Sequence, residues 1–172
     1  VQGDVGSGKT MVAAAAAYCA HSNGFQTALM APTEILAEQH YESLGKLFAP
    51  LGVYTVLLTG SQSQKEKRTA REALASGEAH IAVGTHALIS ESTVFANLGL
   101  VITDEQHRFG VDQRSRLSAK GRDPHILVMS ATPIPRTLAL LMYGDLDVSV
   151  LDELPPGRQK VDTFLVGESY RA

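Results

Sequence analysis

The sequence lacks several features that would mark it as a particular class of protein. Its 172 residues include one cysteine, Cys19, so an internal disulfide and a zinc site built from cysteines are excluded. No apolar run approaches the roughly 20 residues of a membrane span, and no membrane partner is expected. The formal net charge is −3 at pH 7, so the chain as a whole is not a simple basic clamp for nucleic acid. Cys19 lies in a run of small residues and is expected to be a small core residue.

Short apolar runs alternate with longer amphipathic ones along most of the chain. Strands are predicted at residues 27–31, 53–58, 80–84, 100–104, 125–130 and 146–151. Most of these runs are continuously apolar, as expected for strands covered on both faces. Helices are predicted between them at 9–22, 33–49 and 63–77, and the last opens with Ser63 and Glu66 at the spacing of a capping box. This alternation predicts an α/β fold with a parallel sheet and right-handed crossovers.

The two ends of the sequence predict a piece of a longer protein. There is no initiator Met, and only Val1 and Gln2 precede the first motif, so the first strand is expected to be truncated. Near the other end, residues 152–159 contain two prolines and a glycine, which end the preceding element. One domain is therefore predicted over 1–153. Residues 154–172 are interpreted as a linker followed by the first strand of another unit.

Residues 3–10, GDVGSGKT, fit the phosphate-binding pattern G-x-x-x-x-G-K-[S/T] at every position. Glycines let the backbone N–H groups of such a loop point at a polyphosphate, and the following helix adds the positive end of its dipole. Lys9 is expected near the β and γ phosphates, and the Thr10 hydroxyl near Mg²⁺. The alternative is a glycine-rich turn followed by a chance Lys-Thr pair. The residues predicted to bind nucleotide are Gly3, Asp4, Val5, Gly6, Ser7, Gly8, Lys9 and Thr10.

Two acids, an amide and an imidazole stand at the end of the strand predicted over 100–104. Asp104 is the candidate ligand for Mg²⁺, directly or through water. Glu105 is the candidate that positions and deprotonates an attacking water molecule. A solvated strand end is the alternative for this pair. Gln106 and His107 are candidates for reporting the state of the γ-phosphate, although His107 is equally well interpreted as an ordinary hydrogen-bonded histidine.

A second polar segment follows the strand predicted over 125–130. It runs through Ser130, Ala131 and Thr132 into a turn that two prolines make stiff. Its small hydroxyl groups could bridge the acidic segment to something bound nearby. The alternative is a loop with a helix-capping residue. Beside the other two motifs, the segment is predicted to be a coupling element.

These segments together resemble the motifs of superfamily-two helicases and translocases. In chain order, residues 3–10 resemble motif I, 31–40 motif Ia, 59–61 and 84–89 motif Ib, 104–107 motif II, and 130–137 motif III. The finer pattern, with DEQHRFGVDQR, ATPIPRTLA and DELPPGR, resembles the RecG family of bacterial replication-fork helicases. The nearest alternative is the family of transcription–repair coupling translocases, which shares HRFG and TPIPRT but usually has Glu where Gln106 stands.

The resemblance implies the first of two RecA-like lobes, a P-loop NTPase fold with a parallel sheet sandwiched by helices. It implies that ATP and Mg²⁺ bind at the edge of this lobe. The residues it assigns to catalysis are Glu105, Lys9, Gln106 and His107, and those it assigns to coupling are Ser130, Ala131 and Thr132. Nucleic acid would lie across the tops of both lobes. The contacts this implies are Pro32, Thr33, Gly60, Thr85 and His86.

The function implied is ATP-driven remodelling of stalled replication forks and branched DNA in recombination and repair, in the bacterial cytoplasm at the nucleoid. The implied partners are forked DNA and, in the same full-length chain, a second RecA-like lobe and a wedge domain. The family takes its arginine finger, worth roughly 10³- to 10⁵-fold in rate, from the second lobe, so this segment alone is expected to hydrolyse ATP very poorly. The alternative classes are a P-loop ATPase or kinase acting on another substrate and a non-catalytic nucleotide-binding module.

Two stretches concentrate charge. Residues 106–122 carry five basic residues against one acid, and this stretch is interpreted either as a surface that favours DNA or coupling or as a solvated helix face. Residues 65–71 are predicted to be a solvated helix face.

Overall fold

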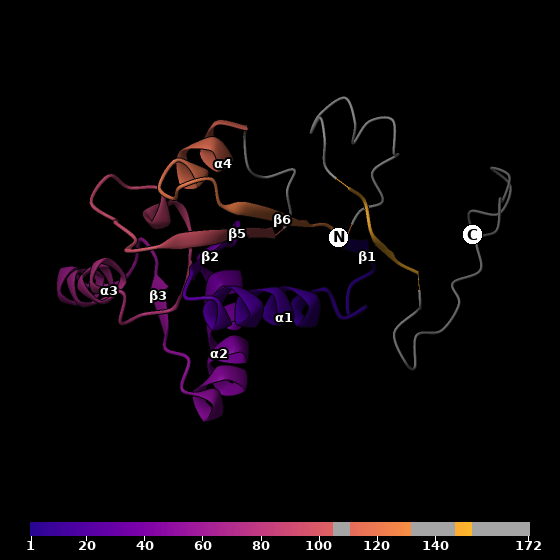
Figure 1. Ribbon diagram of the computed structural model, residues 1–172, viewed down its shortest axis with the longest axis horizontal. Helices are drawn as coiled ribbons and strands as arrows, with labels where there is room; N and C mark the ends of the chain where they lie inside the picture. Colours follow the sequence, from indigo (N-terminus) through magenta and orange to yellow (C-terminus); the bar gives the residue numbers. More distant parts are fainter. Residues whose placement is uncertain (105–110, 132–146, 153–172) are drawn as a thin grey trace, which may run out of the picture.

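A parallel five-stranded sheet forms the centre of the fold in the computed structural model, which describes residues 1–104, 111–131 and 147–152 (Figure 1). Its strands lie in the order β3-β4-β2-β5-β6, and each neighbouring pair is parallel. Their bounds are β2 Gln26–Met30, β3 Thr55–Leu58, β4 Ile81–Gly84, β5 Leu98–Asp104 and β6 His125–Met129. The predicted parallel α/β sheet is therefore confirmed.

The strand that leads into the glycine-rich loop lies beside the end of β6. It is β1, Gln2–Gly3, which pairs in parallel with β7, Val150–Leu151. A bridge joins Gln2 to Ser130, and the Gly3 N–H donates to the Ser130 carbonyl at 3.2 Å. Figure 1 shows the N-terminus and β1 beyond the tip of β6. The first strand thus has two residues, and the strand predicted over 146–151 is shortened to its last two.

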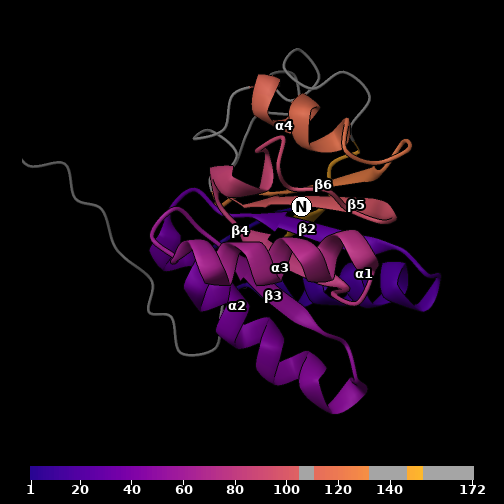
Figure 2. The same cartoon turned by 90° about the vertical axis from the view of Figure 1, so that its left-hand side faces the viewer.

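Helices cover both faces of the sheet. Helices α1, Lys9–Ser22, and α2, Glu34–Phe48, pack on one face, where Ala13, Ala17 and Leu44 join Leu29 and other strand residues in one core cluster. Helices α3, Gln64–Ser76, and α4, Val111–Ser118, belong to the other face. Figure 2 shows α4 and α1 on opposite sides of the sheet. Along β2 to β5 most residues of both alternations are buried, so both faces are covered there, as the continuous apolar runs predict. The edge strand β6 differs, because His125 and Ile126 are exposed.

The local signals in the sequence set most helix ends. Helix α1 has the predicted bounds, and α2 and α3 differ from prediction by one residue at each end. The capping box of α3 is formed: Ser63 Oγ accepts from the Glu66 N–H at 3.3 Å, and Glu66 Oε2 accepts from the Ser63 N–H at 2.8 Å. Gly77 ends this helix with a φ of 82°. Two short 3₁₀ helices, Ala49–Leu51 and His86–Leu88, were not predicted.

The prediction that Cys19 is a core residue is wrong. Its side chain is exposed, because the buried stripe of α1 consists of Ala13, Ala14 and Ala17. Successive residues of a helix are about 100° apart, so residue 19 points away from a stripe centred on those alanines. A small residue in a small-residue run is not necessarily buried.

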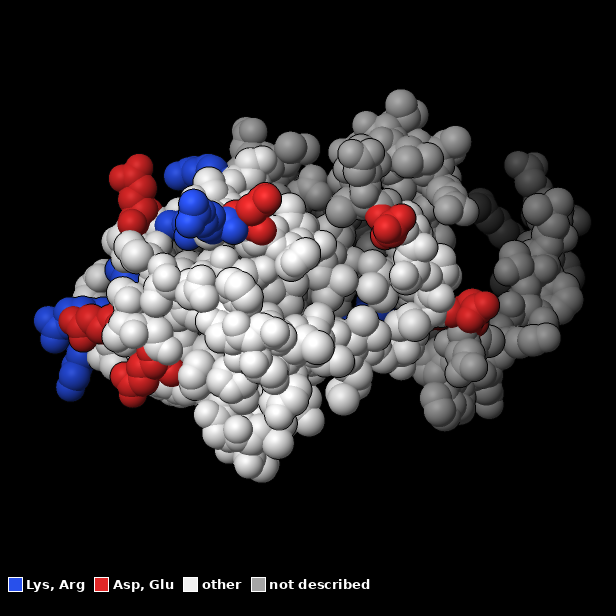
Figure 3. Space-filling model, viewed as in Figure 1, with Lys and Arg blue, Asp and Glu red and all other residues white. Residues whose placement is uncertain are grey.

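Most described basic residues of the two charged stretches are exposed to solvent, but one is hydrogen-bonded to the backbone. Lys65 and Arg68 are exposed on α3, as predicted. In the described part of residues 106–122, Arg116 and Arg122 are exposed. Lys120 instead donates to the carbonyls of Ser90 and Thr93 at 2.8 and 2.7 Å, and burial lowers its pKa. Figure 3 shows basic and acidic side chains interspersed on one face of the molecule.

Several predictions fall on residues outside those that the structure describes. They concern Glu105, Gln106, His107, Thr132 and the segment 154–172. Within the described ranges, no helix has the length and apolar character needed to cross a membrane.

Candidate functional site

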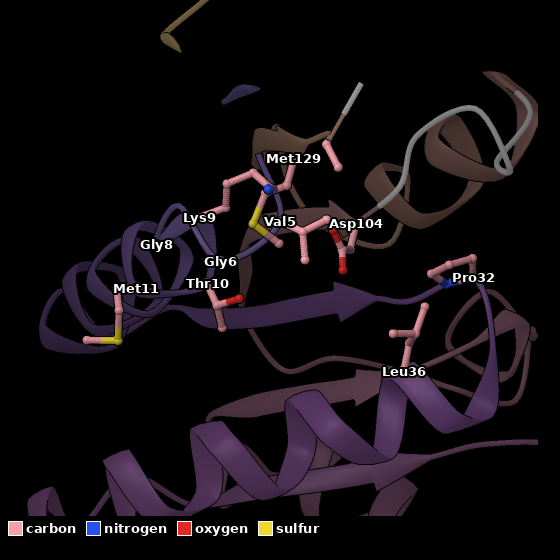
Figure 4. A pocket seen from close by; sticks show the side chains of 11 residues that line it. Val5, Gly6, Gly8, Lys9, Thr10, Met11, Pro32, Leu36, Asp104 and Met129 are labelled. Carbon is pink, nitrogen blue, oxygen red and sulfur yellow. The ribbon is translucent and has the colours of Figure 1, made fainter. Parts of the chain in front are cut away.

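The carboxyl ends of several strands meet around one cavity. In open parallel sheets, ligands bind at this edge, outside the ends of the strands. The cavity has a volume of about 520 Å³. It is lined by residues from the glycine-rich loop, the start of α1, the segment after β2 and the ends of β5 and β6 (Figure 4): Val5, Gly6, Gly8, Lys9, Thr10, Met11, Pro32, Leu36, Asp104, Met129 and Ala131.

The glycine-rich loop has the backbone geometry that an anion site requires. Gly6 and Gly8 have φ values of 83° and 95°, in the left-handed region that only glycine enters without strain. Gly8 directly precedes α1, and its carbonyl accepts from the Met11 N–H at 2.9 Å. The first turn of α1 therefore begins at the cavity wall. Its N–H groups and the positive end of the helix dipole suit a polyphosphate.

Lys9 and Thr10 lie at this first turn, as predicted. The Lys9 ammonium donates to the carbonyls of Gly3 and Asp4 at 2.6 and 2.8 Å, so it holds the two ends of the loop together. Both Lys9 and Thr10 line the same cavity as Asp104, although 94 residues separate Thr10 from Asp104 in the chain. Figure 4 shows the Thr10 hydroxyl and the Asp104 carboxylate on facing sides of this space.

Asp104 is the last residue of β5, and it has a partner that the sequence did not indicate. Its Oδ2 lies 2.7 Å from Nε2 of His40, in α2, and the two side chains are 13% and 12% exposed. An ionised carboxylate can only accept, so the imidazole N–H donates. His40 stands four residues after Leu36, which lines the cavity, and this helical spacing is the signal that could have found it.

The donor chemistry of the cavity fits Mg²⁺. This ion prefers oxygen ligands, keeps several waters and is usually held by one or two protein oxygens together with phosphates. The Thr10 hydroxyl and the Asp104 carboxylate supply two such oxygens. The described residues contain no group of three or more His, Cys, Asp or Glu side chains that could hold a metal ion without such help.

The segment after β6 joins the same site. Ser130 is buried, its N–H donates to the Val1 carbonyl at 3.1 Å, and its carbonyl accepts from the Gly3 N–H. Ala131 lines the cavity. The backbone of the predicted coupling segment is therefore hydrogen-bonded to the strand that leads into the glycine-rich loop.

Two of the residues predicted to contact nucleic acid lie where α2 begins. Pro32 is part of the wall of the cavity described above, with Leu36. Thr33 caps α2, since its hydroxyl accepts from the Leu36 N–H at 3.3 Å. Pro32 thus lies on the cavity wall, and Thr33 follows it in the chain after the carboxyl end of β2.

Gly60 is fixed beside the first turn of α2. Glu34 Oε1 accepts from the Ser61 N–H at 3.0 Å, and a Cβ on Gly60 would lie 2.8 Å from the same oxygen. Hydrogen bonds from Ser61, and then from the Gly60 N–H, lower the pKa of the Glu34 carboxyl. Lys67 donates to the Gly60 carbonyl. Glu34 therefore ties the loop after β3 to the segment after β2, which sequence reasoning missed.

Thr85 and His86 follow β4 at this edge. Thr85 is 7% exposed and its N–H donates to the Leu58 carbonyl at 3.2 Å. His86 is exposed, and its Nε2 lies 3.0 Å from Nε2 of Gln113 in α4. Of this pair, the imidazole is the side chain accessible to a large ligand.

Comparisons with known proteins agree with this geometry. Residues 1–141 match the DEAD/DEAH box helicase family. The ATP-dependent DNA helicase RecG of Bacillus subtilis (strain 168) is 58% identical over 166 residues, which are 96% of this chain and 24% of that protein. RecG of Escherichia coli (strain K12) is 55% identical over 175 residues, covering 99% of this chain and 25% of that protein. The chain thus spans about a quarter of the length of these relatives.

Comparisons with solved structures also find similarity to RecG and other helicases. The structure titled "Structure of RecG bound to three-way DNA junction" superposes with a TM-score of 0.78 at 51% identity, covering 94% of this chain and 21% of that one. A DNA-bound structure of the DUF1998 helicase MrfA has a TM-score of 0.67 at 21% identity over 88% of this chain and 24% of that one, and it shows the fold alone. The expected resemblance to RecG and the RecA-like fold are confirmed.

Proposed function

The chain belongs to the DEAD/DEAH box helicase family, and from that premise we propose that it is the ATP-binding motor lobe of a DNA helicase that remodels stalled replication forks and branched DNA. The observation that carries the proposal is the meeting of the glycine-rich loop, Lys9, Thr10 and Asp104 around one cavity. The similarity to RecG, including the structure with a three-way DNA junction, supports the choice of DNA substrate.

The glycine-rich loop and the start of α1 bind ATP. The N–H groups of Gly6, Gly8 and the start of α1 face the polyphosphate, and the left-handed glycines keep that backbone open to it. Lys9, which bonds to the Gly3 and Asp4 carbonyls, turns its ammonium to the β and γ phosphates when ATP binds. The strength of charge-assisted hydrogen bonds to phosphate favours this exchange.

Hydrolysis depends on residues at the end of β5. The Thr10 hydroxyl and the Asp104 carboxylate would hold Mg²⁺, which neutralises charge on the phosphates when bound. Glu105, assigned from the sequence alone, orients the attacking water and accepts its proton. Gln106 and His107, with Ser130, Ala131 and Thr132, link the state of the nucleotide to closure of the second lobe.

DNA is proposed to cross the edge of the sheet that carries Pro32, Thr33, Gly60, Thr85 and His86. The net charge of −3 does not oppose this, because helix N-termini and backbone N–H groups bind phosphates without a basic surface. The buried Thr85 would contribute through its backbone, and the exposed His86 through its ring. The remaining proposed partners, a second RecA-like lobe and a wedge domain, lie in the rest of a chain about four times longer, as in the RecG relatives. We place this protein in the bacterial cytoplasm, at the nucleoid.

The test is the ATPase rate of the full-length protein with forked DNA, linear duplex, single-stranded DNA and RNA. All four are compared at one salt concentration, because phosphate contacts make binding strongly dependent on salt. We expect the largest stimulation from forked DNA. Stimulation by linear duplex alone would favour a translocase of the transcription-coupled kind. A rate indifferent to every nucleic acid would overturn the helicase function.

A further inference from the structure

His40 makes a contact that neither the motifs nor the proposed function assigns. Its Nε2 lies 2.7 Å from Oδ2 of Asp104, the carboxylate proposed to bind Mg²⁺. We propose that His40 is a positioning residue, which holds the Asp104 carboxylate in the orientation that binds the cation. The inference rests on the proposed function, since it concerns the same site.

Helix α2 carries the imidazole to the end of β5. Leu36, one turn earlier on the same face, lines the cavity, and Figure 4 shows it rising from α2 toward the space into which Asp104 projects. On either side of His40, Ala37 and Leu44 are 0% and 2% exposed and anchor α2 in the core. The donor is therefore held by a packed helix, and side chains on such rigid elements are placed more precisely than those on loops.

The distance and burial favour a bond that restrains the carboxylate. At 2.7 Å the contact has the length of a charge-assisted hydrogen bond. Both side chains are nearly seven-eighths buried, so water and salt screen the bond less than they would on the surface. The bond engages Oδ2 and fixes the rotation of the carboxylate about its Cβ–Cγ bond. Partners of this kind orient metal-binding carboxylates, and losing one typically costs about 10- to 100-fold in metal affinity.

Two other roles for His40 make different predictions. If the bond merely tied α2 to β5, its loss would lower stability without a specific effect on Mg²⁺. If the imidazole competed with the cation for the carboxylate, its loss would tighten Mg²⁺ binding. A measurement that determines Mg²⁺ binding and nucleotide binding separately therefore distinguishes a positioning role from these two alternatives.

The experiment uses the full-length protein and a fluorescent ADP analogue. Its affinity is measured in EDTA and during titration with MgCl₂ for the wild type, His40→Leu and His40→Gln. Gln places an amide N–H near the position of the imidazole Nε2, whereas Leu removes the donor. The control is His125→Leu, the same substitution at an exposed position at the opposite end of the sheet. Thermal unfolding is recorded for every variant.

We expect His40→Leu to raise the MgCl₂ concentration for half-maximal enhancement of binding by about 10- to 100-fold, with affinity in EDTA unchanged. His40→Gln should recover most of the loss, and His125→Leu should behave as wild type. If His40→Leu does not fold, His40→Asn replaces it, because that amide is too short to reach the carboxylate.

An unchanged or lowered MgCl₂ requirement in the variant that lacks the donor would overturn the inference. An equal loss of nucleotide affinity in EDTA and in MgCl₂ would overturn it as well. So would a His40→Gln variant whose MgCl₂ requirement is as high as that of His40→Leu. These results would leave the proposed function standing, since the wild type would still bind the analogue in a Mg²⁺-dependent way. A wild type that binds no nucleotide would overturn both.

Discussion

At the amino end of the sheet, Gln26 is 4% exposed, and its amide donates to the carbonyls of Leu74 and Ala79 at 2.9 and 2.7 Å. At the carboxyl end, Asp104 is also largely buried, but it lies on the wall of a cavity. The side-chain oxygen of Gln26 also accepts from the Asn97 N–H at 2.8 Å, so both the oxygen and the nitrogen of its amide bond to backbone groups. The two buried polar residues therefore have different surroundings. Gln26 bonds to backbone groups of α3 and of two loops, whereas Asp104 bonds to an imidazole and faces a cavity.

The same division holds for neighbouring residues. At the amino end, the Asn97 side chain donates to the Gly24 carbonyl at 2.8 Å, and the ring of His80 accepts from the Tyr54 N–H at 2.9 Å. These bonds satisfy backbone groups that would otherwise be left unpaired in turns. At the carboxyl end, Lys9 and Asp104 face a common space. Burial of a polar side chain thus indicates function only when the surrounding space can hold a ligand.

The largest effect should come from Glu105→Gln, which changes the residue that follows Asp104 in the chain. Loss of a general base lowers turnover by about 10²- to 10⁴-fold, while nucleotide binding should persist because the glycine-rich loop is unaltered. Steady-state ATPase of the full-length protein with forked DNA, beside binding of a fluorescent ADP analogue, measures both quantities. The control is Glu78→Gln, an exposed site at the amino end, which should leave both unchanged. An unaltered kcat for Glu105→Gln would remove the assignment of this residue.

Gln26→Leu, at the amino end, should lower the stability of the lobe rather than its catalytic function, with little loss of nucleotide affinity. It removes the side-chain donor to the Ala79 carbonyl and the acceptor of the Asn97 N–H, and each backbone group left unpaired costs about 1–3 kcal/mol. The Leu74 carbonyl still accepts from the N–H groups of Gly77 and Ala96. Hydrogen–deuterium exchange of peptides from β2 and β5, in the full-length protein, reports the local free energy of opening. Gln39→Leu, at an exposed position of α2, is the matched control. If Gln26→Leu exchanged no faster than this control, the structural role of Gln26 would be refuted.

Two glycine substitutions extend the comparison to the backbone. A Cβ at Gly84, the last residue of β4, would lie 2.1 Å from the carbonyl oxygen of Leu58, so Gly84→Ala should destabilise the carboxyl edge by about 1–3 kcal/mol through overpacking. Gly45, inside α2, has nothing within 4 Å of such a Cβ. Gly45→Ala should therefore stabilise the lobe by roughly 0.5–1 kcal/mol. Opposite signs in thermal unfolding are expected, and a stabilising Gly84→Ala would contradict the close approach of β3 and β4.

The parts of the molecule predicted from the sequence are those set by local chemistry. Helix α1, the Ser63–Glu66 capping box and the parallel sheet followed from spacing and periodicity. The glycine-rich loop and Asp104 stood out in the sequence because a phosphate site and a metal ligand need fixed residue types in a short stretch, and in the structure both line the same cavity.

The contacts that were missed join segments far apart in the chain. His40 meets Asp104 across 64 residues, and Gln26 meets Asn97 across 71. Both depend on β2 lying beside β5, and a strand order of that kind is not written in any local pattern. The exposure of Cys19 was missed for a related reason, because the run of alanines in α1 did not reveal which helix face meets the sheet.

The smallest expected effect is a pH dependence at the amino end. Burial, and then the positive charge of His21, lower the pKa of the His80 imidazole. The two rings lie 4.3 Å apart, and the neutral Nδ1 of His80 accepts from the Tyr54 N–H, which a protonated ring cannot do. Because the unfolded chain binds the proton more readily, this stabilisation is present above the unfolded pKa of about 6.5 and is lost as the pH falls through the lower folded value.

Thermal unfolding of the full-length protein between pH 7.5 and 5 should therefore show a small loss of stability that His80→Asn reduces. The Asn carbonyl oxygen can replace Nδ1 as the acceptor for Tyr54 and does not titrate in this range. His125→Asn, at an exposed site on β6, should retain the wild-type profile. Nucleotide affinity should be equal in all three proteins at each pH, since His80 lies at the opposite end of the sheet from the cavity. A His80→Asn profile that matched the wild type would show that another group controls the acid sensitivity of this lobe.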